Sequence, residues 1–95
     1  MKNPPLIGAQ TAVARLDGWA AAPDRDAIIK SFRFKDFAQA FSFMMQVAQA
    51  AERMDHHPEW SNIYNRVDIL LATHVSGGVT ERDVALAQAI DAAAD

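Results

Sequence analysis

The sequence predicts an α+β domain in which a four-stranded antiparallel sheet carries three helices on one face, in the order α-β-β-α-β-β-α. Three observations support this fold class. Two pairs of short segments with strand-like character flank one long helical segment at residues 36–54. A last segment, after a Gly-Gly loop, has the N-cap chemistry of a helix. Two hairpins joined in one sheet, with the helices packed against it, are the simplest assembly of these elements.

The N-terminal part is expected to contain a short helix and a hairpin. Residues 6–16 indicate the helix, and Asp17-Gly18 marks a turn after it. Residues 19–22 indicate a short strand. Residues 28–34 alternate between two faces and are rich in β-branched and aromatic side chains, which predicts the second strand of the hairpin.

The long helix at residues 36–54 is the clearest element, with Asp36 as its N-cap. It must end before Pro58, because proline disfavours helical geometry in the preceding residue. Most of the helix is apolar, and its polar side chains form one narrow stripe: Gln39, Ser42, Gln46, Gln49 and Arg53. A core helix of unusual hydrophobicity is one interpretation. A helix with one face on the sheet and another against a second subunit fits better, because a monomer's surface helix needs a wider polar face.

The C-terminal part is expected to add the second hairpin and the last helix. Residues 60–64 and 67–74 read as strands. Alternation along the second of them predicts a core face made of Val67, Ile69, Leu71 and Thr73. Thr80 is the expected N-cap of a helix that continues to about Asp91, with acidic residues in its first turn that suit the helix dipole.

Composition restricts the function. A hydrophobic fraction of 51% suits a single folded domain, residues 1–95. The net charge of −3 and the scattered basic residues argue against a nucleic-acid partner. The absence of cysteine excludes disulfides and thiolate chemistry. No apolar run approaches a membrane span of about 20 residues, and no signal-peptide core is visible, so a cytoplasmic location is expected.

The three histidines occupy two junctions: His56 and His57 end the long helix, and His74 ends the last strand. They could be unrelated polar residues on surface loops, a three-histidine zinc site, or a general acid–base site. Adjacent histidines are poor co-ligands because their side chains diverge, and the usual metal-binding spacings are missing. Imidazole titrates near neutral pH, which suits proton transfer. Acid–base chemistry is therefore favoured over metal binding.

The segment from Glu52 to Trp60, ERMDHHPEW, resembles the signature of the pterin-4a-carbinolamine dehydratase family. The resemblance covers roughly Gly18 to Ile90 and is carried by several further motifs: Gly18-Trp19, Phe32 to Phe37, Ala40-Phe41, Asn62 to Val67, Thr73-His74, Gly78 to Asp83 and Leu86-Ala87. A motif of so many parts is highly specific. Ser76 departs from it, because some family members have a cysteine shortly after the third histidine.

The resemblance implies a hydro-lyase that converts a 4a-hydroxytetrahydropterin into quinonoid dihydropterin and water, without a metal or other cofactor. It would support tetrahydropterin recycling after an aromatic amino acid hydroxylase has acted. The catalytic residues that it implies are His56, His57, His74 and Glu52. The implied substrate-binding residues are Asp55, His56, His57, Trp60, Ala72, Thr73, His74 and Val75.

The resemblance also implies a homodimer or homotetramer built on the helix at residues 36–54, in agreement with its apolar surface. A rival function belongs to a different class: a non-catalytic interaction or assembly protein of the same fold. The histidine set discriminates between the two, since a pure binding module has no physical reason to keep it complete. Here the set is complete.

Overall fold

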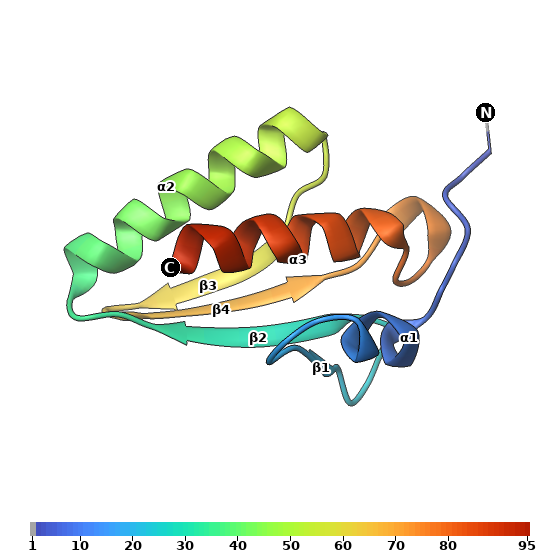
Figure 1. The fold of residues 1–95 in the computed structure, drawn as a ribbon, viewed down its shortest axis with the longest axis horizontal. Helices are drawn as coiled ribbons and strands as arrows, with labels where there is room; N and C mark the ends of the chain where they lie inside the picture. Colours follow the sequence, from blue (N-terminus) through green and yellow to red (C-terminus); the bar gives the residue numbers. More distant parts are fainter. Residues whose placement is uncertain (1) are drawn as a thin grey trace.

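Residues 2–95 are described by a computed structural model in which a single antiparallel sheet is combined with three α-helices (Figure 1). The elements follow the predicted order α-β-β-α-β-β-α, with one added 3-10 turn. Their bounds are α1 Ala9–Ala14, β1 Ala20–Ala21, β2 Ile28–Arg33, α2 Phe37–Met54, β3 Glu59–Ile63, β4 Arg66–Leu71, η1 His74–Ser76 and α3 Glu81–Ala94. The predicted fold class is confirmed.

The sheet has the strand order β1-β2-β4-β3, and each neighbouring pair is antiparallel. The two hairpins, β1-β2 and β3-β4, are joined through their second strands, with Ile28 opposite Leu71 and Phe32 opposite Val67. β4 and β2 therefore lie in the middle of the sheet. β3 and β1 form its edges.

One face of the sheet carries the hydrophobic core. Ile28 and Phe32 of β2 are buried there with every second residue of β4, and α2 and α3 lie side by side over this face (Figure 1). The residues predicted to share the core face of the last strand are all buried: Val67, Ile69, Leu71 and Thr73. α1 packs beside β1 and adds Ala9 and Ala12 to the same core.

The two long helices begin at the predicted caps. The Asp36 carboxylate accepts a hydrogen bond from the Gln39 amide at 2.9 Å at the start of α2. Thr80 caps α3, and Asp83 completes a capping box in which each residue's side chain bonds the other's backbone. The last helix continues beyond Asp91 to Ala94, because the alanine-rich tail has the highest helix propensity of any composition. Among residues 2–95, no helix has the length and apolar character that crossing a membrane requires.

Several predicted bounds were too generous. The first helix covers only Ala9–Ala14, since Gly8 has φ +84° and cannot continue it. The strand predicted at residues 19–22 shrinks to two residues, because Trp19 turns into the core and its Nε1 donates to the Asp91 carboxylate at 3.1 Å. The strand predicted at residues 67–74 ends at Leu71.

The loop that follows β4, residues 73–79, is called the η1 loop below. The Thr73 amide donates to the Gly78 carbonyl at 2.8 Å, so the chain folds back on itself immediately after the strand. His74 therefore begins a 3-10 turn instead of ending a strand. The turn closes at Gly77, whose φ of +77° lies in the left-handed region that glycine tolerates best.

Candidate active site

A cavity of about 250 Å³ opens where the end of α2, the η1 loop and the start of α3 meet. All three histidines line it. The complete lining is Asp55, His56, His57, Ala72, Thr73, His74, Val75 and Arg82. The residues that the sequence placed at two separate junctions therefore come together at one cleft, as the histidine pattern predicts.

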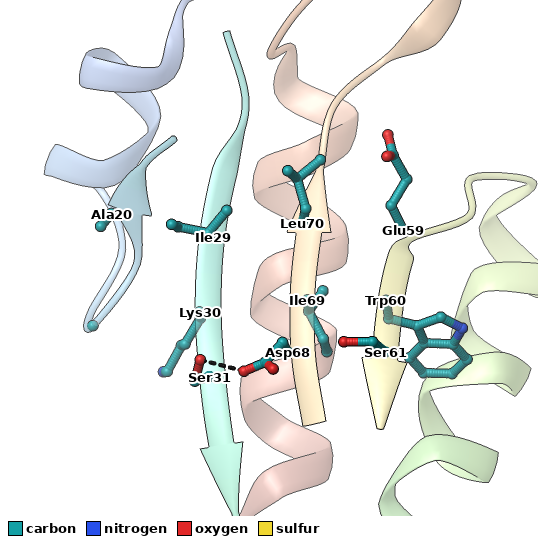
Figure 2. A pocket seen from close by; sticks show the side chains of 11 residues that line it. Ala20, Ile29, Lys30, Ser31, Glu59, Trp60, Ser61, Asp68, Ile69 and Leu70 are labelled. Atoms are coloured by element: carbon teal, nitrogen blue, oxygen red, sulfur yellow. Dashed lines mark hydrogen bonds between the residues drawn. The ribbon is translucent and has the colours of Figure 1, made fainter. Parts of the chain in front are cut away.

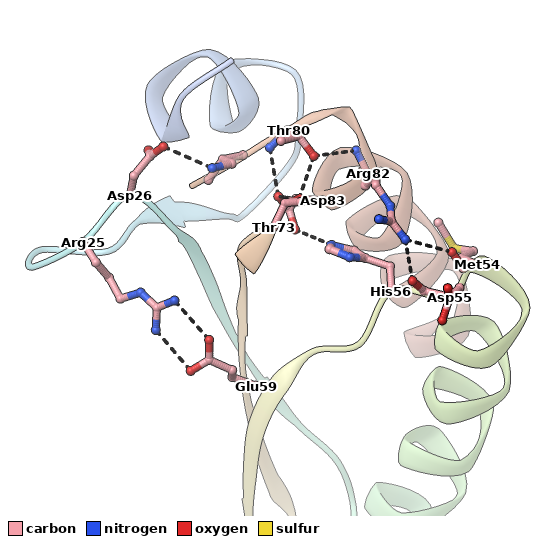
Figure 3. Close-up of polar contacts among 11 residues, drawn as sticks. Arg25, Asp26, Met54, Asp55, His56, Glu59, Thr73, Thr80, Arg82 and Asp83 are labelled. Carbon is pink, nitrogen blue, oxygen red and sulfur yellow. Dashed lines mark hydrogen bonds and ion pairs between the residues drawn. The ribbon is translucent and has the colours of Figure 1, made fainter. Parts of the chain in front are cut away.

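His56 is the buried histidine of the cleft, with 7% of its surface exposed. Its Nε2 lies 2.6 Å from the Oδ1 of Asp83, which is fully buried in the first turn of α3 (Figure 3). A carboxylate accepts hydrogen bonds only, so Nε2 must carry the proton that it donates to Asp83. The pairing thereby fixes the ring's orientation and leaves Nδ1 as the nitrogen that can act on a bound molecule.

The second oxygen of Asp83 is also satisfied. Oδ2 accepts from the Thr73 hydroxyl at 2.8 Å and from the Thr80 amide at 2.9 Å. The two threonine hydroxyls lie 2.6 Å apart and share a further hydrogen bond. A buried carboxylate is stable only when its oxygens are paired in this way. One side chain thus caps α3, holds the beginning of the η1 loop and orients His56.

His57 and Glu52 form a second pair on the outer side of the cleft. The His57 Nε2 lies 2.5 Å from the Glu52 Oε2, and both side chains are more than half exposed. Glu52 is in the last turn of α2, so it reaches the cleft through His57 and is not itself among the lining residues. Exposed pairs contribute little to stability, but this one restricts where the His57 ring can point.

His74 lines the cleft from the η1 loop. It is exposed in η1, and its neighbours Thr73 and Val75 also line the cavity. The backbone on both sides of it is held by the Thr73 carbonyl, which accepts from the Ser76 and Gly77 amides at 3.0 Å each. The exposed ring can therefore meet a molecule bound in the cavity that it lines.

Arg82 fixes the turn that carries the histidine pair. Its guanidinium donates to the backbone carbonyls of Met54 and Asp55, where α2 ends (Figure 3). Asp55 has φ +50°, a left-handed conformation that is uncommon outside glycine and asparagine. The contact from α3 therefore holds the chain direction immediately before His56 and His57.

Arg82 and Asp83 are site residues that the sequence did not predict. The acidic first turn of the last helix was expected only to suit the helix dipole. The available signal was the spacing Thr80-x-x-Asp83, which indicates a capping box only a few residues after a histidine. That a buried histidine would share the same carboxylate depends on tertiary packing, and no local pattern contains it.

Trp60 lies on β3, half-buried against the core, and lines a different hollow. That hollow lies along the strands of the sheet and has a volume of about 580 Å³, with Ile29, Leu70 and the Ser31–Asp68 hydrogen bond in its floor (Figure 2). It is larger than the histidine cleft, but all three histidines line the smaller cavity. Within residues 2–95, no three histidine or acidic side chains converge as metal ligands would.

Two exposed ion pairs, Arg15–Glu81 and Arg25–Glu59, shift the pKa of at least one partner, and the first of them lies at the other side of the α3 start. Arg15, which follows α1, donates a hydrogen bond to the Glu81 carboxylate at 2.6 Å. This hydrogen bond lowers the pKa of Glu81 and raises the pKa of Arg15. Both groups are exposed, so the pair joins α1 to α3 without entering the cleft.

Fold and site together define a small antiparallel α+β protein with a histidine-lined cleft between the end of α2, the start of α3 and the loop that follows β4. Comparison with known proteins adds the family. Residues 7–93 match the family model described as pterin 4 alpha carbinolamine dehydratase. The chain belongs to this family, as its motifs indicate.

Relatives and solved structures agree with this assignment. A Burkholderia multivorans protein named "Putative pterin-4-alpha-carbinolamine dehydratase" is 56% identical over 85 residues, which are 90% of this chain and 83% of the relative. A transcriptional coactivator/pterin dehydratase from Brucella melitensis superposes with a TM-score of 0.87 at 53% identity, covering 90% of this chain and 92% of that one. A pterin dehydratase-like protein identified as a RuBisCO assembly factor in the alpha-carboxysome gives a TM-score of 0.70 at 26% identity, covering 82% and 90%.

Proposed function

We propose that this protein is a dehydratase that converts a 4a-hydroxytetrahydropterin into quinonoid dihydropterin and water. The observation that carries the proposal is the cleft itself: His56, His57 and His74 surround one cavity, and a buried carboxylate holds His56 in a single orientation. Family membership supports the same reaction. The substrate would arise from an aromatic amino acid hydroxylase, whose reaction leaves the hydroxyl group at C4a.

The reaction requires two proton transfers and no change of oxidation state. A general acid protonates the C4a hydroxyl, the C–O bond breaks and water leaves. A general base removes one proton from the pterin ring system, so the proton count balances. Imidazoles suit both steps at neutral pH, and general acid–base catalysis of this kind contributes about 10²–10⁴-fold. We assign these two steps to His56 and His74, which enter the cleft from different elements.

The remaining groups would bind the pterin. His57, held by Glu52, is placed to hold the ring's polar edge. The backbone and side chains of Ala72, Thr73 and Val75 form one wall, and Asp55 lies beside the histidine pair. Trp60 remains a candidate for shaping the pocket from outside the cleft. No step in this scheme calls for a metal or redox group.

The test is a direct dehydration assay. A 4a-hydroxytetrahydropterin is generated in situ by an aromatic amino acid hydroxylase, and its loss is followed by ultraviolet absorbance. We expect the rate to rise in proportion to the concentration of this protein at substoichiometric amounts. A decay rate that stays at the uncatalysed value over a hundredfold range of protein concentration would reject the proposal.

A second candidate function is non-catalytic, and one observation favours it. α2 exposes an aromatic and aliphatic stripe made of Phe37, Phe41 and Met45, which are 48%, 49% and 54% exposed. Such a surface fits a protein partner, and one relative of 26% identity is an assembly factor. The competing occupant of the same stripe is a second copy of this chain, which the dehydratase proposal favours. A chain that leaves dehydration unaccelerated yet forms a stable complex with another protein through α2 would favour the assembly role.

A further inference from the structure

The segment before α1, residues 3–8, runs along the η1 loop (Figure 1). We call it the N-terminal strap. The Asn3 Nδ2 donates to the Val75 carbonyl at 2.8 Å, and the Ser76 hydroxyl donates to the Pro4 carbonyl at 2.6 Å. These two bonds hold the tip of the loop, immediately after His74. Ser76, where some family members have a cysteine, thereby joins the η1 loop to the strap.

The other end of the strap is anchored more firmly. The Ile7 amide donates to the Val79 carbonyl at 2.9 Å. The Asp26 carboxylate, which Figure 3 labels in the turn between β1 and β2, accepts from the Ala9 amide at 2.8 Å and from the Val79 amide at 3.1 Å. A Cβ at Gly78 would overlap this carboxylate, so glycine is needed there for Asp26 to reach the Ala9 and Val79 amides. The strap is thus fixed at the base of the loop and reaches forward to its tip.

The loop tip has few other restraints. His74 and Val75 are exposed, and neither side chain is part of the hydrophobic core. Apart from the strap, residues 2–95 hold the tip through the short η1 turn, in which the Ser76 and Gly77 amides donate to the Thr73 carbonyl and the Gly77 amide also donates to the His74 carbonyl. A single 3-10 turn is a weak element by itself, and its hydrogen bonds face water. The position of His74 therefore depends on what the strap adds.

We propose that the N-terminal strap is a positioning element for His74, in which Asn3 and Ser76 keep the η1 loop in the form that binds substrate. This inference rests on the proposed dehydratase function for its kinetic part. When a loop is competent only part of the time, the apparent dissociation constant rises by the inverse of the competent fraction. Bound substrate restores the loop, so the turnover of the complex changes little.

The variants Asn3→Ala, Ser76→Ala and the double variant test the strap in the full-length protein. For the double variant we expect KM to rise about three- to tenfold with kcat within about twofold of wild type. Ser76→Thr keeps the hydroxyl that donates to Pro4, so its KM should equal that of the wild-type protein. The matched control is Ser61→Ala, an exposed serine on β3 outside the cleft, which should leave both constants unchanged.

Two readouts do not depend on activity: hydrogen exchange of the Ser76 and Gly77 amides, and the NMR signals of the His74 ring. We expect faster exchange and a shifted or broadened ring signal in the double variant, and neither change in the wild-type protein or in Ser61→Ala. Unchanged exchange would overturn the strap, and faster exchange with an unchanged KM would overturn its positioning role. If the wild-type protein fails the dehydration assay, the proposed function fails, and the strap is then judged on these two signals.

Discussion

At the scale of single residues, Asp83 is a fully buried carboxylate that depends on three hydrogen bonds. Its two oxygens accept from His56, Thr73 and the Thr80 amide with no exposure to solvent. An asparagine of the same shape has one acceptor and one donor. If its oxygen faces the threonines, its NH2 group faces the Nε2 of His56 and requires that nitrogen to accept.

We therefore predict that Asp83→Asn changes the tautomer of His56. The proton moves to Nδ1, the dehydration rate falls about tenfold or more, and stability decreases by about 1–3 kcal/mol. Nitrogen-15 NMR of the ring identifies the tautomer directly. Asp91→Asn on the same helix is the control, because it breaks contacts with Lys30 and Trp19 outside the cleft. An unchanged tautomer in Asp83→Asn would contradict the assigned role.

The two proposed proton-transfer residues give a second prediction. His56→Ala and His74→Ala should each lower the dehydration rate by about a hundredfold, which is the usual scale for losing a general acid or base. Because the two act in one reaction, the double variant should lose less than the product of the single losses. Single-turnover measurements separate this effect from binding. Rates at the wild-type level in both single variants would remove the histidines from the mechanism.

The sequence predicted the histidine cluster because its members stand at the ends of recognisable elements. It did not predict their environments. His56 is buried and paired with a carboxylate 27 positions later in the chain, whereas His57, its neighbour in sequence, is exposed. Adjacent residues point in different directions, and only the packing of α3 against the end of α2 decides which of them is enclosed.

At the scale of elements, α2 carries the prediction with the largest consequence. Its inner side buries Phe43 and Val47 within the chain, and its outer side exposes Phe37, Phe41 and Met45. Burying each such side chain fully contributes roughly 1.5–3 kcal/mol. Pairing the same helix across a two-fold axis would bury all three side chains twice.

We predict a homodimer or a homotetramer formed through α2 at low micromolar concentration. Sedimentation equilibrium should give two or four times the 10.4 kDa of one chain. Phe41→Glu should shift the protein toward monomer, because it places a charge in the apolar contact. Gln46→Glu adds the same charge on the polar stripe of the same helix and should leave the assembly intact. A wild-type species of 10.4 kDa alone would contradict this prediction.

The long elements were predictable because their signals are local: a capping aspartate, a helical period and alternation on β4. The short ones were not. Trp19 is of a residue type that favours strands, but its indole donates a hydrogen bond to Asp91, which is 72 positions away. The strand therefore begins only after Trp19 and has two residues. The strand predicted to reach His74 stops early for a similar reason, since the Thr73 amide bonds to Gly78 and the chain turns back.

At the scale of the whole molecule, the arrangement of the site predicts metal-independent turnover. The Nε2 atoms of His56 and His57 are each committed to a carboxylate, Asp83 and Glu52 respectively. A metal would have to bind through the remaining ring nitrogens, and within residues 2–95 no three histidine or acidic side chains converge as ligands. Exhaustive treatment with EDTA or 1,10-phenanthroline should leave the dehydration rate within error of the untreated protein. Activity that is lost on chelation and restored by stoichiometric zinc would establish a metal site instead.

The capping box of α3 restricts which amino acids position 83 can accept. Glutamate is the usual partner of threonine in such a box, so Asp83→Glu would be an obvious substitution for raising the stability of α3. Here the extra methylene would push the carboxylate out of register with the imidazole that it supports. Because one carboxylate both caps α3 and orients His56, we expect a substitution at position 83 to change the stability of the protein and its proposed activity together.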